Sequence, residues 1–241
     1  MSDSNKLTAV GHVVELWRYP VKSMAAEPLD HVEVGWHGLA GDRRWAFTRA
    51  AAVQSGFPWL TMRQRSELRL YRPSFTDPAL PDSSPTVVKT PSGGSFDVAD
   101  PALASEIFPT AVRVVRQDRG VFDAFSLSLI STQSVERLGD MVGEELDVSR
   151  FRPNIVMAAT NGTAFFEDSL VGSVVRIGGM RMRIDKRDGR CVVITIDPAT
   201  GDRNPAILRA VASEREGYLG VYGSVVEPGT VAVGDPILLD K

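Results

Sequence analysis

The sequence predicts a mainly β protein with a few helices (α+β), and three observations support this. Many short segments are rich in β-branched and aromatic residues and are bounded by Gly, Pro or Asp. Helical segments are few, and each has recognisable start and stop signals. The alternation of strands and helices typical of a doubly wound sheet is absent, as are a dinucleotide glycine fingerprint and a phosphate loop. We therefore expect a barrel-like β architecture with covering helices.

The predicted strands follow one another closely along the chain. In the first half they cover residues 10–17, 31–34, 45–48, 68–71 and 112–115. In the second half, Gly178 and Gly179 divide the alternating segment 174–184, which suits a hairpin turn that needs positive φ. Further strands are expected in the segment NIVM that starts at Asn154, at 191–196, and twice within 229–239.

Two of the predicted helices have N-terminal caps in the sequence. Asp100 and Pro101 begin the first, since Pro costs no hydrogen bond at the first helical position. Ser131 or Thr132 can cap the second, which is expected to stop at Gly139.

A third helix is predicted between Asn204 and Gly217, with Pro205 at its first position. Its apolar residues recur at helical spacing, so one face is expected to pack on a sheet: Ile207, Leu208, Val211 and Ala212.

Composition and charge exclude several classes of protein. The chain has 241 residues, of which 43% are hydrophobic, and a net charge of -3, so neither a nucleic-acid partner nor a membrane partner is expected. Its N-terminal residues are polar, and a single cysteine cannot hold a four-cysteine iron–sulfur cluster. These features favour a cytoplasmic protein. The Pro- and Ser-rich stretch 73–85 predicts a long exposed loop, and we expect a domain boundary between this loop and Phe125.

Cys191 is the one cysteine, and two interpretations of it are open. It can be a buried structural residue that behaves as a small hydrophobe. Alternatively, the cations at Lys186, Arg187 and Arg190 favour its thiolate, the form that acts as a nucleophile or binds a metal. No histidine lies near it in the sequence, which argues against a protease-type nucleophile and a protein-only zinc site. A soft thiolate can still anchor a metal whose other ligands come from a cofactor.

Three polar segments at predicted strand ends are candidate anion contacts. Lys22 and Ser23 follow a strand-ending proline, and Arg43 follows two turn-forming glycines. Arg152 and Asn154 flank a further proline in the segment FRPN. Arginine suits bidentate phosphate contacts. Each segment alone is equally compatible with a solvated turn.

Five motifs taken together carry a resemblance. The order YPVKS, GLAGDRRW, RFRPNIV, RC followed by TIDPATG, and finally PGTVAVGDP closely resembles the MOSC-domain molybdenum proteins, in particular the mitochondrial amidoxime-reducing component and its bacterial counterparts. The resemblance implies an N-terminal MOSC β domain over residues 8–120, packed on a C-terminal MOSC β-barrel over residues 121–240. It also implies a cofactor in the cleft between them.

The resemblance further implies roles for individual residues. Cys191 matches the catalytic cysteine whose thiolate ligates molybdenum, the metal otherwise held by the dithiolene of a molybdopterin. Lys22, Ser23 and Arg43 match residues that hold the phosphate of the pterin. The remaining implied contacts with the cofactor are Ser131, Arg152, Asn154, Arg190 and Thr195.

By this resemblance the expected activity is a two-electron reduction of the N–O bond in small N-hydroxylated substrates by the molybdenum–molybdopterin cofactor. Electrons are expected from a separate donor protein of the ferredoxin or flavin type. Pyridoxal phosphate binding is a further property that membership of such a family would suggest. Two alternatives stay open, a protein that carries sulfur as a persulfide on Cys191 and a non-catalytic carrier of the cofactor.

Overall fold

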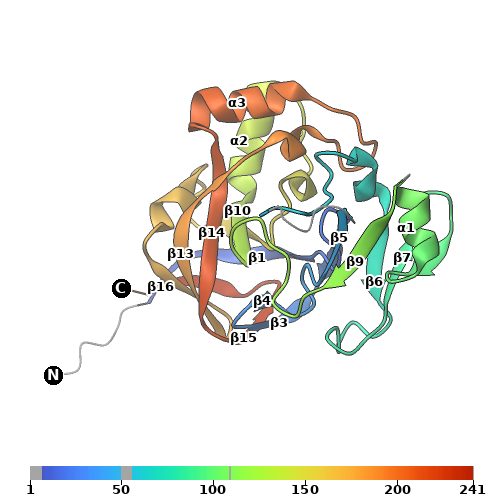
Figure 1. Cartoon of the computed structure of the whole chain (residues 1–241). Helices are drawn as coiled ribbons and strands as arrows, with labels where there is room; N and C mark the ends of the chain where they lie inside the picture. Colours follow the sequence, from blue (N-terminus) through green and yellow to red (C-terminus); the bar gives the residue numbers. More distant parts are fainter. Residues whose placement is uncertain (1–6, 50–55, 109, 241) are drawn as a thin grey trace.

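The structure is a computed structural model that describes residues 7–49, 56–108 and 110–240. The polar segment 1–6 considered above lies outside the described residues. Most described elements are strands, which confirms the mainly β prediction, and they form a barrel at one end and smaller sheets at the other (Figure 1). Among the described residues, no helix has both the length and the apolar character needed to cross a membrane.

A closed barrel of seven strands forms the larger part of the molecule. The order around it is β11 (Ile155–Ala159), β10 (Leu127–Ser131), β14 (Tyr218–Glu227), β13 (Met180–Gly189), β12 (Val174–Ile177), β16 (Pro236–Asp240) and β1 (Thr8–Arg18). Pairing of β1 with β11 closes it, and β2 (Glu27–Leu29) continues from β1. The N-terminal strand therefore belongs to the barrel, although the rest of the barrel comes from the second half of the chain.

The barrel interior is filled by apolar side chains that alternate with outward-facing ones. Val13, Val175, Met182 and Val221 are fully buried there. The hairpin between β12 and β13 turns at Gly178, whose φ of 55° agrees with the predicted positive φ. One small sheet, β15 (Gly229–Ala232), β3 (His31–Gly35) and β4 (Gly38–Leu39), lies beside the barrel.

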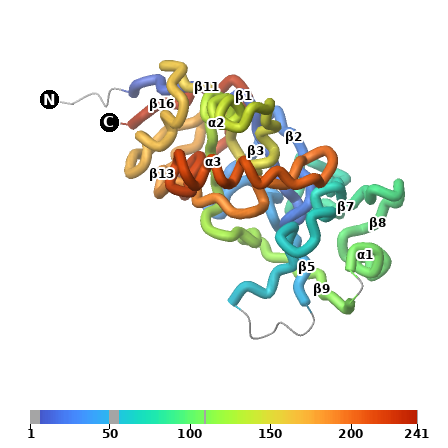
Figure 2. The backbone as a smooth tube through the Cα atoms, turned by 90° about the horizontal axis from the view of Figure 1, so that it is seen from above, coloured from blue at the N-terminus to red at the C-terminus, as the bar shows by residue number. Residues whose placement is uncertain are grey.

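Two further sheets lie at the opposite end of the molecule, as Figure 2 shows from above. One pairs β5 (Trp45–Arg49) with β9 (Val112–Arg116), and the other contains β6 (Arg72–Phe75), β7 (Thr86–Lys89) and β8 (Ser95–Asp97). Helix α1 (Pro101–Ile107) covers them, with the predicted Asp100 cap accepting from the N–H of Ala102. Phe47, Leu68 and Leu103 are buried in the second apolar core that results.

Helices α2 (Thr132–Val142) and α3 (Pro205–Arg215) cover the outside of the barrel and pack on each other. The third core lies beneath them, where Leu138, Ile207 and Val211 are fully buried. Ala212, predicted on the packed face, is instead exposed. Helix α2 also continues past the predicted stop at Gly139 to Gly143, whose φ is 75°. A Cβ at Gly139 would lie 2.7 Å from the carbonyl oxygen of Glu144, so the close packing favours glycine at this helical position.

Beyond Ala212 and the end of α2, further predictions of local structure were wrong. Residues 66–70 form a 3-10 helix, η1 (Ser66–Leu70), where a strand was expected to begin at residue 68. The strand expected at 191–196 is a 3-10 helix, η4 (Val192–Thr195). The start of the predicted 73–85 loop belongs to strand β6. Two more 3-10 helices complete the described elements, η2 (Val148–Phe151) and η3 (Phe166–Leu170).

The charged segment before Cys191 belongs to strand β13. Lys186 pairs with Tyr222, and Gly189 pairs with Tyr218, so the β13–β14 ladder runs to the residue before Arg190. The ladder contains three register shifts, and irregularities of this kind bend a strand and increase its twist. Cys191 therefore lies at the end of a strand and immediately before a helical turn.

Candidate functional site

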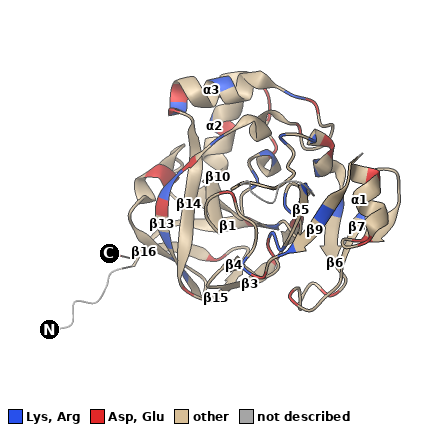
Figure 3. Ribbon diagram, in the orientation of Figure 1, with Lys and Arg blue, Asp and Glu red and all other residues tan. Residues whose placement is uncertain are grey.

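A pocket of about 600 Å³ lies where the barrel meets the smaller sheets, and it gathers most of the predicted site residues. The structure brings seven of them to its wall: Lys22, Ser23, Arg43, Arg152, Asn154, Arg190 and Cys191. Eight cations line the pocket, although the whole chain has a net charge of -3: Lys22, Arg43, Arg63, Arg150, Arg152, Lys186, Arg187 and Arg190. Figure 3 marks the Lys and Arg positions along the ribbon. Local cations rather than the overall field therefore determine what the pocket binds.

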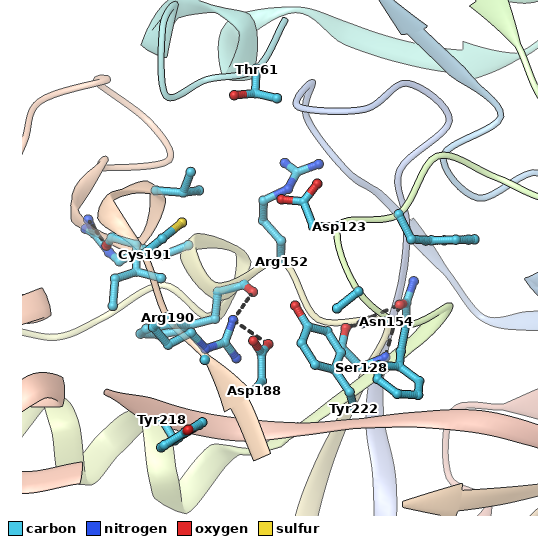
Figure 4. Close-up of a pocket in the computed structure, with 18 of the residues that line it drawn as sticks. Thr61, Asp123, Ser128, Arg152, Asn154, Asp188, Arg190, Cys191, Tyr218 and Tyr222 are labelled. Atoms are coloured by element: carbon cyan, nitrogen blue, oxygen red, sulfur yellow. Dashed lines mark hydrogen bonds and ion pairs between the residues drawn. The ribbon is translucent and has the colours of Figure 1, made fainter. Parts of the chain in front are cut away.

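Cys191 presents its sulfur to this pocket. The residue is half-buried and extended, and it immediately precedes η4. Its Sγ lies 3.6 Å from Nη2 of Arg63, which donates towards it. In Figure 4 the sulfur lies on one side of the pocket and the Asp123 carboxylate on the other. A half-exposed sulfur beside a guanidinium is suited to metal ligation or nucleophilic chemistry, whereas a sulfur sealed in the core is not.

Asp123 connects two cations of the pocket. It pairs with Nζ of Lys22 on one oxygen, and its other oxygen lies 2.8 Å from Nη2 of Arg63. Burial favours protonation of Asp123, but the charges of Lys22 and Arg63 hold its pKa below the usual value. Burial lowers the pKa of Lys22, and Asp123 opposes this effect. Because Arg63 also reaches the sulfur, a continuous set of charged contacts joins Lys22 to Cys191.

Arg43 and Arg152 both lie against the buried ring of Tyr19. Their guanidinium carbons are 4.5 and 4.2 Å from the ring centroid, within the range of cation–π attraction. The Tyr19 hydroxyl donates to the carbonyl of Pro153 at 3.0 Å, and burial raises its pKa above the ordinary value. Burial, with the nearby charge of Arg43, lowers the pKa of Arg152 to about 10, so both arginines are cationic at neutral pH.

The backbone is strained at three of the predicted contact residues. Ser23, Arg43 and Arg152 have φ values of 69°, 50° and 55°, a left-handed conformation that non-glycine residues rarely adopt. Each such residue costs of order 1 kcal/mol and persists only where surrounding contacts enforce it. Among the described residues only two others with side chains, Phe165 and Glu216, share this conformation. Strain of this kind concentrates at ligand sites.

The side chain of Asn154 connects the segment before β11 with the segments that contain Trp17 and Asp42. Its Nδ2 donates to Oδ2 of Asp42 at 3.1 Å and to the carbonyl of Trp17 at 3.3 Å. Asp42 also accepts from the Tyr19 N–H and pairs with Arg43. Gly38 and Gly41, with φ of 99° and 79°, form the predicted sharp turn that brings Asp42 there. The amide of Asn154 is thus used largely in positioning Asp42, although the residue lines the pocket.

Arg190 lies beside Asp188 in the pocket wall (Figure 4), and three contacts hold it there. It pairs with the buried carboxylate of Asp188 at 2.8 Å and donates to the carbonyls of Leu219 and Phe151. Burial raises the pKa of Asp188, and its hydrogen-bond partner Tyr222 also has a raised pKa because of burial. This cluster fixes the end of β13 and therefore the position of Cys191.

The structure does not bring two predicted cofactor contacts to the pocket. Ser131 is fully buried at the start of α2, where its hydroxyl meets Glu167 at 2.8 Å and accepts from the N–H of Ser134. Thr195 is also buried, and its hydroxyl donates to the carbonyl of Val192 inside η4. Both side chains are used within helical turns, so the geometry gives them structural roles.

Sequence reasoning missed Arg63 and Asp123. Neither lies in a segment with strand or helix periodicity, and they are 60 residues apart. Their place in the site becomes visible only in the structure, where Arg63 contacts Cys191 although the two residues are 128 positions apart in the sequence. The three histidines, His12, His31 and His37, are exposed and none lines the pocket. Within residues 7–49, 56–108 and 110–240, no three His, Cys, Asp or Glu side chains gather as a metal-binding group.

The fold and pocket define a two-part β protein with a cationic pocket beside a single accessible thiol. Comparison with known families identifies both parts. The MOSC domain matches residues 117–238, and the MOSC N-terminal beta barrel domain matches residues 10–114. The chain therefore belongs to the MOSC family, as its motifs indicated. The domain boundary predicted at residue 120 stays a prediction.

Curated relatives extend over nearly the whole chain. Mitochondrial amidoxime reducing component 2 of Bos taurus is 26% identical, over 96% of this chain and 84% of the relative. Mitochondrial amidoxime-reducing component 1 of Homo sapiens is 25% identical, over 97% of this chain and 84% of the relative. Molybdenum cofactor sulfurase of Drosophila grimshawi is 27% identical over 93% of this chain, but only 34% of that longer protein is covered.

Among solved structures, the YUAD protein of Bacillus subtilis has a similar fold. The TM-score is 0.54, with 14% sequence identity and coverage of 97% of this chain and 98% of that one. At this identity the likeness concerns the fold alone.

Proposed function

We propose that the pocket binds a molybdenum cofactor of the molybdopterin type and that the protein uses it to reduce N-hydroxylated compounds. The observation that carries the proposal is the half-buried sulfur of Cys191, which faces a pocket where cations from separate chain segments converge. The names of the amidoxime-reducing relatives support the substrate class.

The residues present fit such a group in three respects. A thiolate at Cys191 is a soft ligand appropriate to a metal whose remaining ligands belong to a cofactor. Lys22, Ser23 and Arg43 would hold a phosphate by charge-assisted hydrogen bonds. Arg152 also has a buried Nη2 without a hydrogen-bond partner among the described residues, so a donor is available for a further polar group of the ligand.

When bound, the cofactor supplies the two-electron redox chemistry. The overall reaction takes two electrons and two protons, breaks the N–O bond, and releases the reduced nitrogen compound and water. Asp123 is ionised at neutral pH because its pKa is lowered, so it accepts hydrogen bonds from Lys22 and Arg63 and is not the proton source. Arg63 donates towards the sulfur and thereby stabilises negative charge on it.

The single cysteine leaves this chain unable to hold a four-cysteine iron–sulfur cluster. Electrons are therefore proposed to come from a separate donor protein. Lys186 lies over the ring of Phe125 on the pocket wall, 5.2 Å from its centroid, where an exposed cation can attract an acidic surface of such a donor. The cytoplasmic location also stays a prediction.

The test of the proposed function is reduction of benzamidoxime and 6-hydroxylaminopurine with reduced viologen as the electron source. Protein purified from a host that makes molybdopterin is expected to consume both compounds, and Cys191→Ala is expected to lose the activity. Val192→Ala changes an exposed neighbour and serves as the matched control. A wild-type protein that contains the cofactor and reduces neither compound would support a carrier role instead.

A sulfur-carrying function is the second candidate. The accessible sulfur of Cys191 and the relative named molybdenum cofactor sulfurase favour it. A persulfide on Cys191 would raise the intact mass by one sulfur atom and be removed by cyanide. Stoichiometric molybdenum with no such sulfur would exclude this function.

A further inference from the structure

A second pocket, of about 320 Å³, lies against the first at Arg150 and Arg152. Its walls come from η1, from the segment after η4 and from the end of β1. Figure 1 shows η1, between β5 and β6, beside the chain that runs from η4 to α3. The proposed role of Cys191 makes no use of this second pocket, because neither Cys191 nor Arg63 lines it.

Arg69 is the unusual residue of the second pocket. It is only 8% exposed, yet within the described part of the chain its guanidinium has neither a hydrogen bond nor an ion pair, and its Nε is buried without a partner. Burial lowers the pKa of Arg69 to about 10, so it stays charged at neutral pH. A buried charge is normally paired, because leaving water is costly.

Other cations of this pocket also have unused donors. Arg150 pairs with Asp197 at 2.9 Å, but its Nε is buried without a partner. Arg152 donates Nη1 to the carbonyl of Met24 at 2.7 Å, and its Nη2 is without a partner. Arg72 adds a fourth guanidinium.

Negative charge in the wall is sparse by comparison. Asp147 is the one carboxylate among the described residues that line the second pocket. Its Oδ1 already accepts from the N–H of Ser149 at 2.8 Å, where it caps η2. Asp197, next to the pocket wall, is likewise engaged by Arg150. Four guanidinium groups thus face two engaged carboxylates, and the pocket lacks about two negative charges for balance.

Much of the rest of the wall is apolar. Trp17, Leu70 and Pro198 line it together with Met62 and Ile196. Pockets with apolar walls and a few convergent polar groups are typical of sites for small organic ligands.

We propose that the second pocket is an anion site that takes the phosphate of a small organic phosphate, with Arg69 as its principal ligand and the apolar wall against the organic part. Arginine presents two parallel N–H groups that match phosphate oxygens, and the doubly charged phosphate supplies the missing negative charge. The proposal goes beyond the proposed function, since it requires neither molybdenum nor the thiol.

Arg69→Met is the discriminating variant because Arg69 lines only the second pocket, whereas Arg150 and Arg152 line both. Arg113→Met, on the exposed surface of β9, removes the same charge elsewhere and is the matched control. Binding of phenyl phosphate and of inorganic phosphate to the full-length protein is measured by calorimetry, and the melting temperature is measured with and without each. No molybdenum is needed, so the outcome is independent of the proposed redox activity.

The wild type and Arg113→Met are expected to bind phenyl phosphate equally, and Arg69→Met at least tenfold more weakly. Without phosphate, Arg69→Met is expected to melt at a higher temperature than the wild type, because an unpaired buried charge is gone. Tighter binding of phenyl phosphate than of inorganic phosphate supports an organic ligand, and equal binding indicates free phosphate. Unchanged phenyl phosphate binding in Arg69→Met would overturn the proposal, as would a lower melting temperature of this variant without phosphate.

Discussion

Replacing Asp123 by Asn removes the carboxylate that pairs with both Lys22 and Arg63. The Lys22 side chain is 7% exposed, and its burial already lowers its pKa, so loss of its partner leaves an almost unpaired buried ammonium. Breaking a fully buried pair costs about 3–5 kcal/mol, and breaking an exposed pair costs about 1 kcal/mol or less. Because Asp123 is 39% exposed, we expect Asp123→Asn to lower the free energy of unfolding by about 1–2 kcal/mol at pH 7.

The assay is urea unfolding of the wild type and the variant between pH 3 and pH 8. The folded pKa of Asp123 is lowered, so its contribution to stability is present above the unfolded value of about 3.9 and is lost as the pH falls through the folded value. The difference between the two proteins should therefore shrink at acid pH. Asp118→Asn is the control, because that side chain is 89% exposed and its Arg116 partner is 3.7 Å away. Equal effects of the two variants, or a difference that does not shrink as the pH falls, would show that the charge of Asp123 does not stabilise the fold.

Three further predictions concern contacts around the site. Ser131→Ala should lower the free energy of unfolding, measured by urea unfolding, by about 1–3 kcal/mol, because a helix cap and a buried hydrogen-bond donor are lost. Its cofactor content should not change, and a loss of cofactor at unchanged stability would contradict this prediction. Gly220→Ala should lower the melting temperature of the protein more than Gly217→Ala does. Both glycines have positive φ, but only at Gly220 would a Cβ lie 2.9 Å from a backbone carbonyl oxygen of β10. Equal decreases in melting temperature would contradict this close packing. Lys22→Met should retain at least tenfold less pterin after gel filtration than Lys89→Met, a control at an exposed site. The reason is the loss of a charge-assisted contact worth about 1.5–3 kcal/mol. Equal retention of pterin by the two variants would show that Lys22 does not hold the cofactor.

Local signals in the sequence predicted much of the fold. Strands β3, β5 and β9 lie within a residue of their predicted limits, because short β-branched segments between turn residues are distinctive. Asp100 and Asn204 marked the starts of two helices, because such side chains accept hydrogen bonds from the first free N–H groups of a helix. Closure of the barrel by pairing of β1 with β11 could not be predicted in this way. The paired residues are about 140 positions apart, and no local sequence pattern indicates such a pairing.

One wrong local prediction, the strand expected at 191–196, has a clear physical cause. Residues 192–195 are β-branched throughout, a composition typical of strands. In the structure Ile194 is buried in the core beneath α2 and α3, and the backbone makes a helical turn to place it there. Tertiary burial thus overrides the local propensity of this segment.

The candidate site was only partly predictable. Lys22, Arg43 and Arg152 stand beside Pro or Gly at strand ends, where turn chemistry marks them. Arg63 and Asp123 lack such a signal, because what places them at the sulfur is contact between distant segments. Ser131 shows the opposite case, since a hydroxyl at a helix start is equally suited to capping.

The central claim is that the Cys191 sulfur ligates the metal of a pterin cofactor held by the surrounding cations. Its most direct test is the ratio of molybdenum to pterin, measured by elemental analysis and pterin fluorescence in protein from a host that makes the cofactor, with reconstitution of any empty protein. We expect a ratio close to one in the wild type and a ratio reduced severalfold in Cys191→Ala, with pterin retained. Equal ratios in the two proteins, or a wild type that takes up no molybdenum after reconstitution, would contradict the account.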